Sequence, residues 1–532
     1  MRHGSQEGNG FTDMNETNFD FKSANDRRRK RRLISVIGVI LSVVFLVLAG
    51  IFVYLAVRTE FLTEVYLIII IAVLVILFGL EIFLTCNSRK KGRCIAGIII
   101  SLILSLCLGW ASYMVAKTYG VLNSITNSIS QVTHIGVFVL DDDEAVNIAG
   151  AADYTFGILA ANDRENTNKA LAEVQAAIGK EPATIEYQDN DTLIDALYAK
   201  DVKVIVINEA NRSPIEEYYK TFSDDTRVLN THKVETVIQE DEKLDDITKT
   251  PFNVYLSGID VYGSIKATSR SDVNVIVTVN PNTKQILLTS TPRDYYVPLT
   301  VSNGIPDKLT HAGIHGVDCS IGTLENLYGI DIDYYVRVNF TSVRKIVDLL
   351  GGVKVYSDYD FTSDWGPSFK KGYNQVNGKQ ALAFCRERHH FANGDYQRGR
   401  DHQHMIEAIL NKAMSPDILP NYADLLKTAS KNFQTNMSTK EITALAKMQL
   451  NDMSQWTIKY ANAAGQGASK TTYSYQSRKL YVCVPDYNSV AKITKRINKV
   501  LKATPESVEN EKSESSSDED SAMPGDEDKA IK

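Results

Sequence analysis

The stretch SDVNVIVTVN (271–280) is joined to QILLTST (285–291) by the turn PNTK (281–284). In the first stretch valine recurs at every second position from 273 to 279, which is the period of a β-strand. Turn residues between two such stretches predict two neighbouring strands. This pair lies inside the segment 253–407, around which we expect the main domain to form.

Strand and helix patterns continue on both sides of this pair. FNVYLSGID (252–260) reads as a strand, and TSVRKIVDLLGGV (341–353) places its apolar residues on one helical face before two glycines end the helix. Further predicted elements are a helix at Gly378–Ala383, a strand at CRER (385–388), a helix at His402–Ala413 and a strand at LYVCVP (480–485). Helices around a mixed sheet predict an α/β/α sandwich over 250–503, with its core at 253–415.

A second, smaller domain is expected at 131–243, where strand and helix patterns alternate. The predicted strands are HIGVFVL (134–140), TFGILA (155–160), TIEYQ (184–188) and VKVIVIN (202–208), and the predicted helices are Asn168–Ile178 and TLIDALYAK (192–200). These patterns indicate a small α/β domain. It carries no catalytic constellation, because the carboxylates of Asp141–Asp143 fit a solvated loop better than a cation site. We interpret it as an accessory or docking module.

The N-terminal part contains three apolar runs. The first, 33–57, carries no charge, and a bilayer is crossed by roughly 20 apolar residues in a helix. The others lie at 61–86 and 94–116, so three transmembrane helices are expected over 33–116. The first run is too long for a signal peptide, and further spans follow it directly.

Basic residues predict the orientation of these spans. RRRKRR (27–32) precedes the first span, and four basic residues lie between the second and third, at 89–93. Cytoplasmic flanks carry the excess of lysine and arginine. We therefore expect a basic cytoplasmic tail (1–32), a multi-pass protein of the plasma membrane and extracellular C-terminal domains. A nucleic-acid role for the basic tail leaves the matching basic loop unexplained.

The remaining bulk properties exclude several classes of protein. The net charge is −6, but ten acidic and only three basic residues follow from Glu506 onward, so the body of the chain is nearly neutral. Such a body offers no basic face for nucleic acid. The cysteines form no CxxC pair, although one disulfide among Cys319, Cys385 and Cys483 remains open. The acidic, serine-rich tail at 506–532 is expected to be disordered.

Five arginines and three carboxylates lie in or near the ends of the strand-like runs of the main domain. They are Arg270, Arg293, Arg386, Arg388 and Arg398, with Asp260, Asp272 and Asp395. Arginine binds phosphate oxygens two at a time, and Mg²⁺ prefers one or two carboxylates together with phosphate oxygens. The combination is typical of a magnesium-assisted site for a polyphosphate, where Asp395 can take the proton from an attacking hydroxyl.

Each of these signals also has a purely structural interpretation. Residues 386–388 fit an exposed edge strand with alternating charges, and 293–294 fit an ion pair in a surface turn. Asp260 and Asp272 fit caps at the ends of strands. His311 and His315 have the spacing of a zinc pair on a helix, but no third ligand is visible, so solvated or locally bonded histidines are favoured.

Together the motifs resemble the LytR–CpsA–Psr family. The matching pieces, in order, are LSGID (256–260), SRSD (269–272), TPRD (291–294), Lys308, YYVRVNF (334–340), VDLLGGV (347–353), NGKQALAFCRER (377–388) and GDYQRGRDHQ (394–403). The resemblance implies an extracytoplasmic enzyme of Gram-positive bacteria. Such an enzyme moves a glycopolymer from a polyprenyl-pyrophosphate carrier to peptidoglycan, with Mg²⁺ as cofactor.

Residue matching within this resemblance assigns roles to the polar residues. It implies that Asp260 and Asp272 hold Mg²⁺, that Arg293, Asp272 and Asp395 are catalytic, and that pyrophosphate contacts come from Arg270, Arg293, Arg386, Arg388, Arg398, His402 and Gln403. Where the family usually has glutamine, four residues after Arg398, this chain has His402, with Gln403 next to it. We also expect an apolar groove in the main domain for the lipid tail.

The three spans and the extra domain depart from the single span that is common in the family. This arrangement is similar to the capsule-linked streptococcal branch and implies capsular polysaccharide as the polymer, with capsule-assembly membrane proteins as further partners. An alternative function is a lipid-pyrophosphate-binding regulator of wall assembly with weak pyrophosphatase activity. A transcriptional regulator is disfavoured, because the short cytoplasmic piece cannot hold a helix-turn-helix domain.

Overall fold

The computed structural model describes residues 13–58, 64–86, 91–126, 130–237, 246–259, 265–391, 394–415 and 433–509. Its backbone divides into two compact units, Met1–Gly120 and Val121–Lys532, which are treated separately. The predicted acidic tail at 506–532 lies largely outside the described residues.

The first unit consists of long helices, α1 (Asp13–Arg58), α2 (Glu64–Cys86) and α3 (Lys91–Thr126). Within the described residues three segments are long and apolar enough to cross a membrane, namely Val36–Arg58, Tyr66–Leu84 and Gly92–Lys117. Their side chains are largely exposed to the surroundings, as lipid-facing helices require. The prediction of three apolar spans is confirmed, and the direction of crossing stays a prediction.

The accessory domain is built on one five-stranded sheet in the order β3-β2-β4-β1-β5. Its strands are β1 (Ser130–Leu140), β2 (Thr155–Leu159), β3 (Ala183–Tyr187), β4 (Val204–Asn208) and β5 (Thr226–Val237). Its helices are η1 (Ile148–Ala151), α4 (Arg164–Ile178), α5 (Asn190–Tyr198), η2 (Glu209–Asn211), α6 (Arg212–Glu216) and α7 (Phe222–Asp225). The sequence patterns predicted β1 to β4, α4 and α5, but not β5, which pairs along the whole of β1.

Alternation along β1 divides the core of this domain into two layers. Val137 and Val139 pack with Ala170 and Val174 of α4 on one face of the sheet. Phe138 packs on the opposite face with side chains of α5. Asp143 lies in the loop after β1 and accepts a hydrogen bond from the backbone of Ala145, as expected of a loop carboxylate.

The main domain is built on a six-stranded sheet in the order β16-β11-β6-β7-β8-β17. The strands are β6 (Phe252–Ile259), β7 (Ser271–Asn280), β8 (Gln285–Thr291), β11 (Tyr334–Asn339), β16 (Phe433–Thr435) and β17 (Thr457–Asn462). Strand β7 runs antiparallel to both β6 and β8, whereas β6–β11 and β8–β17 are parallel pairs. The mixed sheet is therefore as predicted.

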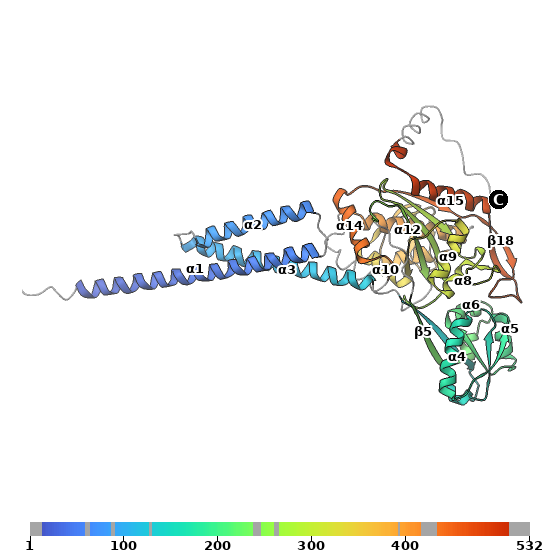
Figure 1. Ribbon diagram of the computed structural model, residues 1–532. Helices are drawn as coiled ribbons and strands as arrows, with labels where there is room; N and C mark the ends of the chain where they lie inside the picture. The colour runs from blue at the N-terminus through green and yellow to red at the C-terminus, as the bar shows by residue number, and fades with distance from the viewer. Residues whose placement is uncertain are drawn as a thin grey trace, which may run out of the picture. The chain divides into compact units, whose positions relative to one another are not determined.

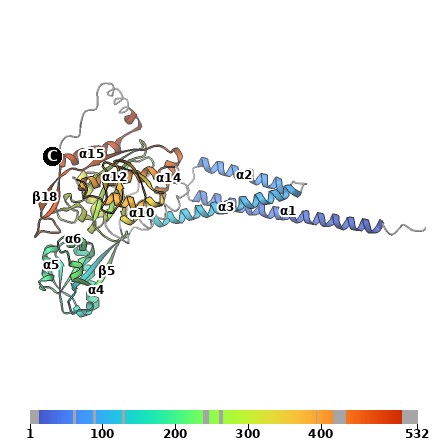
Figure 2. The ribbon, with the colours of Figure 1, turned by 180° about the vertical axis from the view of Figure 1, so that it is seen from behind.

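Helices cover both faces of this sheet (Figures 1 and 2). On one face Ile276 and Leu287 pack with α9 (Val317–Tyr328) and α15 (Tyr487–Lys502). On the other face the alternate valines of β7 pack with α12 (Gly394–Ala413) and α14 (Thr439–Asp452). The period of two in the sequence thus places successive β7 side chains in different layers. The α/β/α sandwich is confirmed.

Shorter elements complete the main domain. They are β9 (Tyr296–Pro298), β10 (Pro306–Lys308), α8 (Leu309–Ala312), η3 (Gly313–His315), α10 (Phe340–Leu349), β12 (Val353–Ser357), β13 (Phe361–Thr362), β14 (Ser368–Phe369), β15 (Gly372–Val376), α11 (Gly378–Arg386), β18 (Gly465–Lys470) and β19 (Leu480–Pro485). Strand β19 pairs with β18 in a separate ribbon rather than joining the main sheet.

The prediction of a strand at CRER (385–388) is wrong. Cys385 and Arg386 are the last residues of helix α11, which begins at a capping box on Asn377. Ala381, Phe384 and Cys385 are buried on one face of that helix. Helix α12 also begins earlier than predicted, at Gly394, so most of the GDYQRGRDHQ motif is helical.

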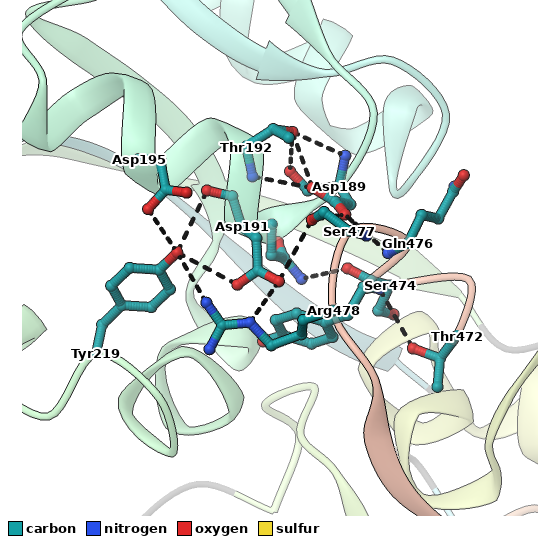
Figure 3. Close-up of polar contacts among 12 residues, drawn as sticks. Asp189, Asp191, Thr192, Asp195, Tyr219, Thr472, Ser474, Gln476, Ser477 and Arg478 are labelled. Carbon is teal, nitrogen blue, oxygen red and sulfur yellow. Dashed lines mark hydrogen bonds and ion pairs between the residues drawn. The ribbon is translucent and has the colours of Figure 1, made fainter. Parts of the chain in front are cut away.

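A network of hydrogen bonds holds the accessory domain on the main domain (Figure 3). The carboxylate of Asp189, the residue that caps α5, accepts bonds of 2.7 Å from the backbone N–H groups of Gln476 and Ser477. Beside it, Arg478 Nε lies 2.6 Å from an oxygen of Asp191. Asp189 and Asp191 are almost fully buried, so these bonds are shielded from water.

Replacing Asp189 with alanine should loosen this docking. The variant loses a buried, charged acceptor that serves several donors, which lowers the free energy of unfolding by about 2 to 3 kcal/mol. Thermal unfolding of the full chain in detergent measures the loss, and hydrogen exchange should rise at 474–478. Asp153→Ala is the control, because its exposed carboxylate pairs only with Lys180, and it should leave both readouts unchanged. Equal effects in the two variants would contradict the role of Asp189.

Candidate active site

The five arginines predicted from the sequence as site residues line one polar pocket of about 290 Å³ in the main domain. Its wall also contains Asp272 and His402, two further residues of the predicted site. The described residues that line it are Glu217, Arg270, Asp272, Val273, Arg293, Phe340, Asp364, Trp365, Cys385, Arg386, Glu387, Arg388, His389, Arg398 and His402. The five arginines therefore lie around one common space.

Strand pairing brings Asp272 and Arg293 together. Asp272 is the second residue of β7 and Arg293 follows β8, and the antiparallel register sets the start of β7 beside the end of β8. Arg293 Nη1 lies 2.8 Å from Asp272 Oδ1, which also accepts a bond of 3.0 Å from Thr310. Both charged side chains are about nine-tenths buried. The alternative ion pair of Arg293 with Asp294 is also present, with Nε and Oδ1 3.8 Å apart, but it is equally buried and so is not an ion pair of a surface turn.

The arginines keep the carboxyl group of Asp272 ionised. Burial alone would raise its pKa, but the positive charges of Arg293, Arg270 and Arg398 outweigh this effect and hold the pKa below its ordinary value. A carboxylate in this state can accept a hydrogen bond or bind a cation.

Arg270 is held by the accessory domain. Its Nη2 donates a hydrogen bond of 2.8 Å to Ser213 Oγ on α6, and its Nη1 pairs with the carboxylate of Glu217, which follows α6. Arg270 is 7% exposed, so it lies beneath these two residues. The accessory domain therefore supplies part of the pocket wall.

Aromatic rings position Arg386 at the end of α11. Its guanidinium carbon lies 4.7 Å from the centre of the Phe340 ring and 4.1 Å from that of Trp365. Stacking of this kind holds a guanidinium group in a fixed orientation. The next residue, buried Glu387, accepts bonds of 2.9 Å from the backbone N–H groups of Asp364 and Arg388 and so shapes the turn that carries Arg388.

Helix α12 presents Arg398 and His402 one turn apart on the pocket wall. His402 Nε2 lies 2.9 Å from the carbonyl oxygen of Cys385, to which it donates. Burial, together with the nearby Arg398, lowers the pKa of His402 to about 4, so its ring is neutral at pH 7. A neutral imidazole adds no further positive charge to the pocket.

Other predicted site residues lie elsewhere. Gln403 does not line the pocket, because its amide donates to the carbonyls of Leu288 and Ala461 in the sheet core, and its assignment to pyrophosphate is corrected. Asp260 lies outside the described residues, as does the side chain of Asp395 in the first turn of α12. Their roles stay predictions.

The histidine and cysteine alternatives are also resolved for the described residues. His311 is buried and bonded at 2.8 Å to Asp307, so it is locally bonded rather than solvated. His315 belongs to η3 and not to the helix of His311, and no described cluster unites the two with a third metal ligand. Cys319, Cys385 and Cys483 are not joined in a disulfide.

An apolar groove of about 560 Å³ adjoins the polar pocket. It lies between the valine-bearing face of the main sheet and helices α10, α12 and α14, and Val273, Phe340, Cys385 and His402 line both spaces. Its wall is formed almost entirely by aliphatic and aromatic side chains. The groove has the size and lining of a binding site for an apolar ligand. The predicted lipid groove thus has a structural counterpart.

Sequence reasoning missed Glu217, Ser213, Trp365 and Phe340. Glu217 and Ser213 precede Arg270 by more than 50 positions and belong to another domain, so no local pattern connects them. Phe340 was visible inside the YYVRVNF motif, but its stacking on Arg386 depends on tertiary structure.

The low pKa of His402 has a measurable consequence for stability. Its pKa in the folded state is about 4, below the ordinary 6.5 of the unfolded chain. As the pH falls below 6.5, His402 is protonated in the unfolded chain but stays neutral in the folded chain, which stabilises the unfolded state. Between pH 7 and pH 5 this costs about 2 kcal/mol of stability. His402→Gln should therefore lose correspondingly less stability over that interval, as seen in thermal midpoints at the two pH values. Parallel losses in the parent and the variant would contradict this.

Comparison with known proteins identifies the family. A model of the LytR–CpsA–Psr family matches residues 215–496. The polyisoprenyl-teichoic acid–peptidoglycan teichoic acid transferase TagU of Bacillus licheniformis is 34% identical over 223 residues, which are 42% of this chain and 72% of the relative. The protein of the same name from Enterococcus faecalis is 34% identical over 231 residues, 43% and 75% of the two chains.

Solved structures of similar proteins include the crystal structure of B. subtilis TagV, with 28% identity, a TM-score of 0.42, and coverage of 48% of this chain and 99% of that one. The family match spans more than half of this chain, and the two transferases are each matched over more than two thirds of their length. The chain belongs to the LytR–CpsA–Psr family.

Proposed function

We propose that this protein is a membrane-anchored transferase that moves a glycopolymer from a polyprenyl-pyrophosphate carrier to peptidoglycan outside the cell. The observation that supports it best is the arginine-lined pocket beside an apolar groove, with His402 and Phe340 on the wall of both. A polyprenyl pyrophosphate has the same two halves, an anionic head and an apolar tail. The matched relatives are named as transferases of teichoic acid to peptidoglycan, which is the same class of reaction.

The proposed step is a displacement at phosphorus. The hydroxyl oxygen of the acceptor attacks the sugar-linked phosphorus and forms a new P–O bond. The bond from that phosphorus to the bridging oxygen breaks, and polyprenyl phosphate leaves with the electron pair. The hydroxyl proton passes to a carboxylate, for which we propose Asp395 in the first turn of α12. The arginines hold the phosphoryl oxygens and offset their charge.

The described residues fit a magnesium ion in this site. Mg²⁺ needs only one or two protein carboxylates when phosphate oxygens complete its shell, and Asp272 is an ionised carboxylate on the pocket wall. We propose Asp272 and Asp260 as its ligands. When bound, the ion would offset negative charge on the phosphoryl oxygens.

The polymer and the topology are further parts of the proposal. The three apolar spans and the additional N-terminal domain support capsular polysaccharide as the polymer, whereas the matched relatives are named for teichoic acid. The basic flanks at 27–32 and 89–93 support a cytoplasmic N-terminus and extracellular C-terminal domains.

Arg293→Ala should slow transfer strongly while the protein remains folded. The full chain in detergent is incubated with peptidoglycan fragments, Mg²⁺ and a short-chain polyprenyl pyrophosphate that carries either a capsular repeat or a teichoic acid unit. Mass spectrometry should detect a phosphodiester-linked adduct, made faster from the capsular donor. Loss of one preorganised charge contact lowers the rate roughly 100-fold or more. Arg164→Ala, which removes an exposed ion pair with Glu186, should retain the parent rate.

Other outcomes of this assay would favour other functions. Monophosphate release without an adduct would indicate a pyrophosphatase. Binding of the carrier without any turnover would indicate a regulator. An adduct formed equally well by Arg293→Ala would remove the arginine pocket from the mechanism.

Filling the groove should weaken the use of long lipid carriers selectively. Ala446 lines the groove on α14, and Ala446→Trp would place an indole ring where methylene groups of the tail would be buried. Each lost methylene costs about 0.8 kcal/mol, so two of them lower affinity roughly tenfold. The variant should raise the KM for a long-chain carrier and leave that for a short-chain carrier nearly unchanged. Ala491→Trp on the exposed side of α15 is the matched control. A shift independent of chain length would contradict the groove as the tail site.

A further inference from the structure

A second cluster of ligand-type side chains lies outside the residues that line the arginine pocket. Asp401 and His404 are three positions apart on α12, and Asp358 directly follows β12. Each offers one potential ligand atom, and these atoms all lie within 4.8 Å of one another. Asp401 is 0% and His404 8% exposed, whereas Asp358 is half-buried. The cluster is thus largely closed to water, unlike an acidic surface patch.

Two buried polar atoms of this cluster have no hydrogen-bond partner among the described residues. They are Asp401 Oδ2 and His404 Nδ1. Buried polar groups in native proteins are nearly always paired with protein, water or an ion. An acceptor oxygen and a ring nitrogen that are both unpaired, in one buried cluster, therefore point to a missing ligand.

The surrounding hydrogen bonds orient the three side chains. Gln397 Nε2 donates at 2.9 Å both to Asp401 Oδ1 and to Asp358 Oδ2, so it bridges the carboxylates through one oxygen of each. The imidazole of His404 packs edge-on against the rings of Tyr356 and Tyr460, with centroids 5.5 and 5.3 Å away. Outer contacts of this kind orient the ligands of metal sites.

The two carboxylates of the cluster are paired with only one positive charge. Arg400 Nε lies 3.7 Å from Asp358 Oδ2, whereas none of the described lysines or arginines forms an ion pair with Asp401. A bound cation would supply the charge that two carboxylates require.

We propose that Asp358, Asp401 and His404 bind one divalent transition-metal ion, Mn²⁺ or Zn²⁺. Two carboxylate oxygens and one imidazole nitrogen suit these ions, whereas Mg²⁺ and Ca²⁺ prefer oxygen ligands alone. This site is separate from Asp272 and the proposed magnesium ion. None of its three ligands lines the arginine pocket.

The ion would fix helix α12 to the end of β12. Asp401 and His404 belong to the helix, and Asp358 to the segment after the strand, so one ion joins the two elements. The same helix carries Arg398 and His402 on the wall of the arginine pocket. The three ligands are therefore positioning residues, which hold the pocket wall without touching the substrate.

Metal retention by the full chain in detergent tests this site. The protein is stripped with a chelator, incubated with Mn²⁺ or with Zn²⁺ in separate samples that also contain excess Mg²⁺, and washed on a sizing column. Elemental analysis should find one retained transition-metal ion per chain. His404→Gln and Asp401→Asn should each weaken retention at least about tenfold. Retention of Mn²⁺ alone or Zn²⁺ alone supports the site and identifies its ion.

Control variants separate this site from others. Asp272→Asn should retain the ion, which keeps this result independent of the proposed magnesium site. Asp364→Asn should also retain it, because Asp364, Glu387 and His390 form the other described ligand-type cluster and two of its members are exposed. If Asp401→Asn misfolds, the half-buried Asp358→Asn provides the same test.

A spectroscopic measurement distinguishes coordination from a structural effect. Co²⁺ loaded in place of the native ion should give a visible absorption band that His404→Gln shifts, because one nitrogen ligand is replaced. A parent chain that retains no transition metal would overturn the proposal and leave a buried water as the occupant. Equal retention by the parent and all variants would overturn it too.

Discussion

Repulsion between like charges is the constraint on which the candidate site depends. Five guanidinium groups line one pocket of about 290 Å³, and two unit charges 4 Å apart in a partly buried site repel by about 4 kcal/mol. The pocket is stable because carboxylates lie between the arginines, with Asp272 beside Arg293 and Glu217 beside Arg270. These ion pairs offset part of the repulsion and hold the arginines around one space.

The sequence predicted the elements whose pattern repeats locally. The alternating valines of β7 and the apolar face of α10 were both found as expected, because burial imposes those periods. The strand predicted for the CRER segment was wrong because alternating charges are typical of an exposed strand. In the structure Phe384 and Cys385 pack in the core as the end of a helix. The assignment of Gln403 to pyrophosphate was wrong because neighbouring residues of a helix point about 100° apart. His402 faces the pocket, so Gln403 points into the sheet core.

Relations between distant segments were beyond the reach of sequence patterns. Glu217 meets Arg270 across 53 positions, and the docking of Asp189 uses backbone N–H groups that every sequence possesses. The accessory domain, interpreted from its sequence as a separate module, therefore contributes directly to the arginine pocket. A domain boundary drawn along the chain does not coincide with the boundary of the site. Any change that moves α6 also changes the surroundings of Arg270.

Helix α12 forms part of the wall of both the polar pocket and the apolar groove. Its early turns present Arg398 and His402 to the polar pocket, and its later turns present Met405, Ile406 and Ile409 to the apolar groove. A helix rises 1.5 Å per residue, so Arg398 and Ile409 lie about 16 Å apart along one rigid axis. The helix thus fixes the distance between the polar pocket and the apolar groove. A one-residue insertion in its middle would turn its two halves about 100° out of phase, so that the walls of the pocket and of the groove would no longer face each other.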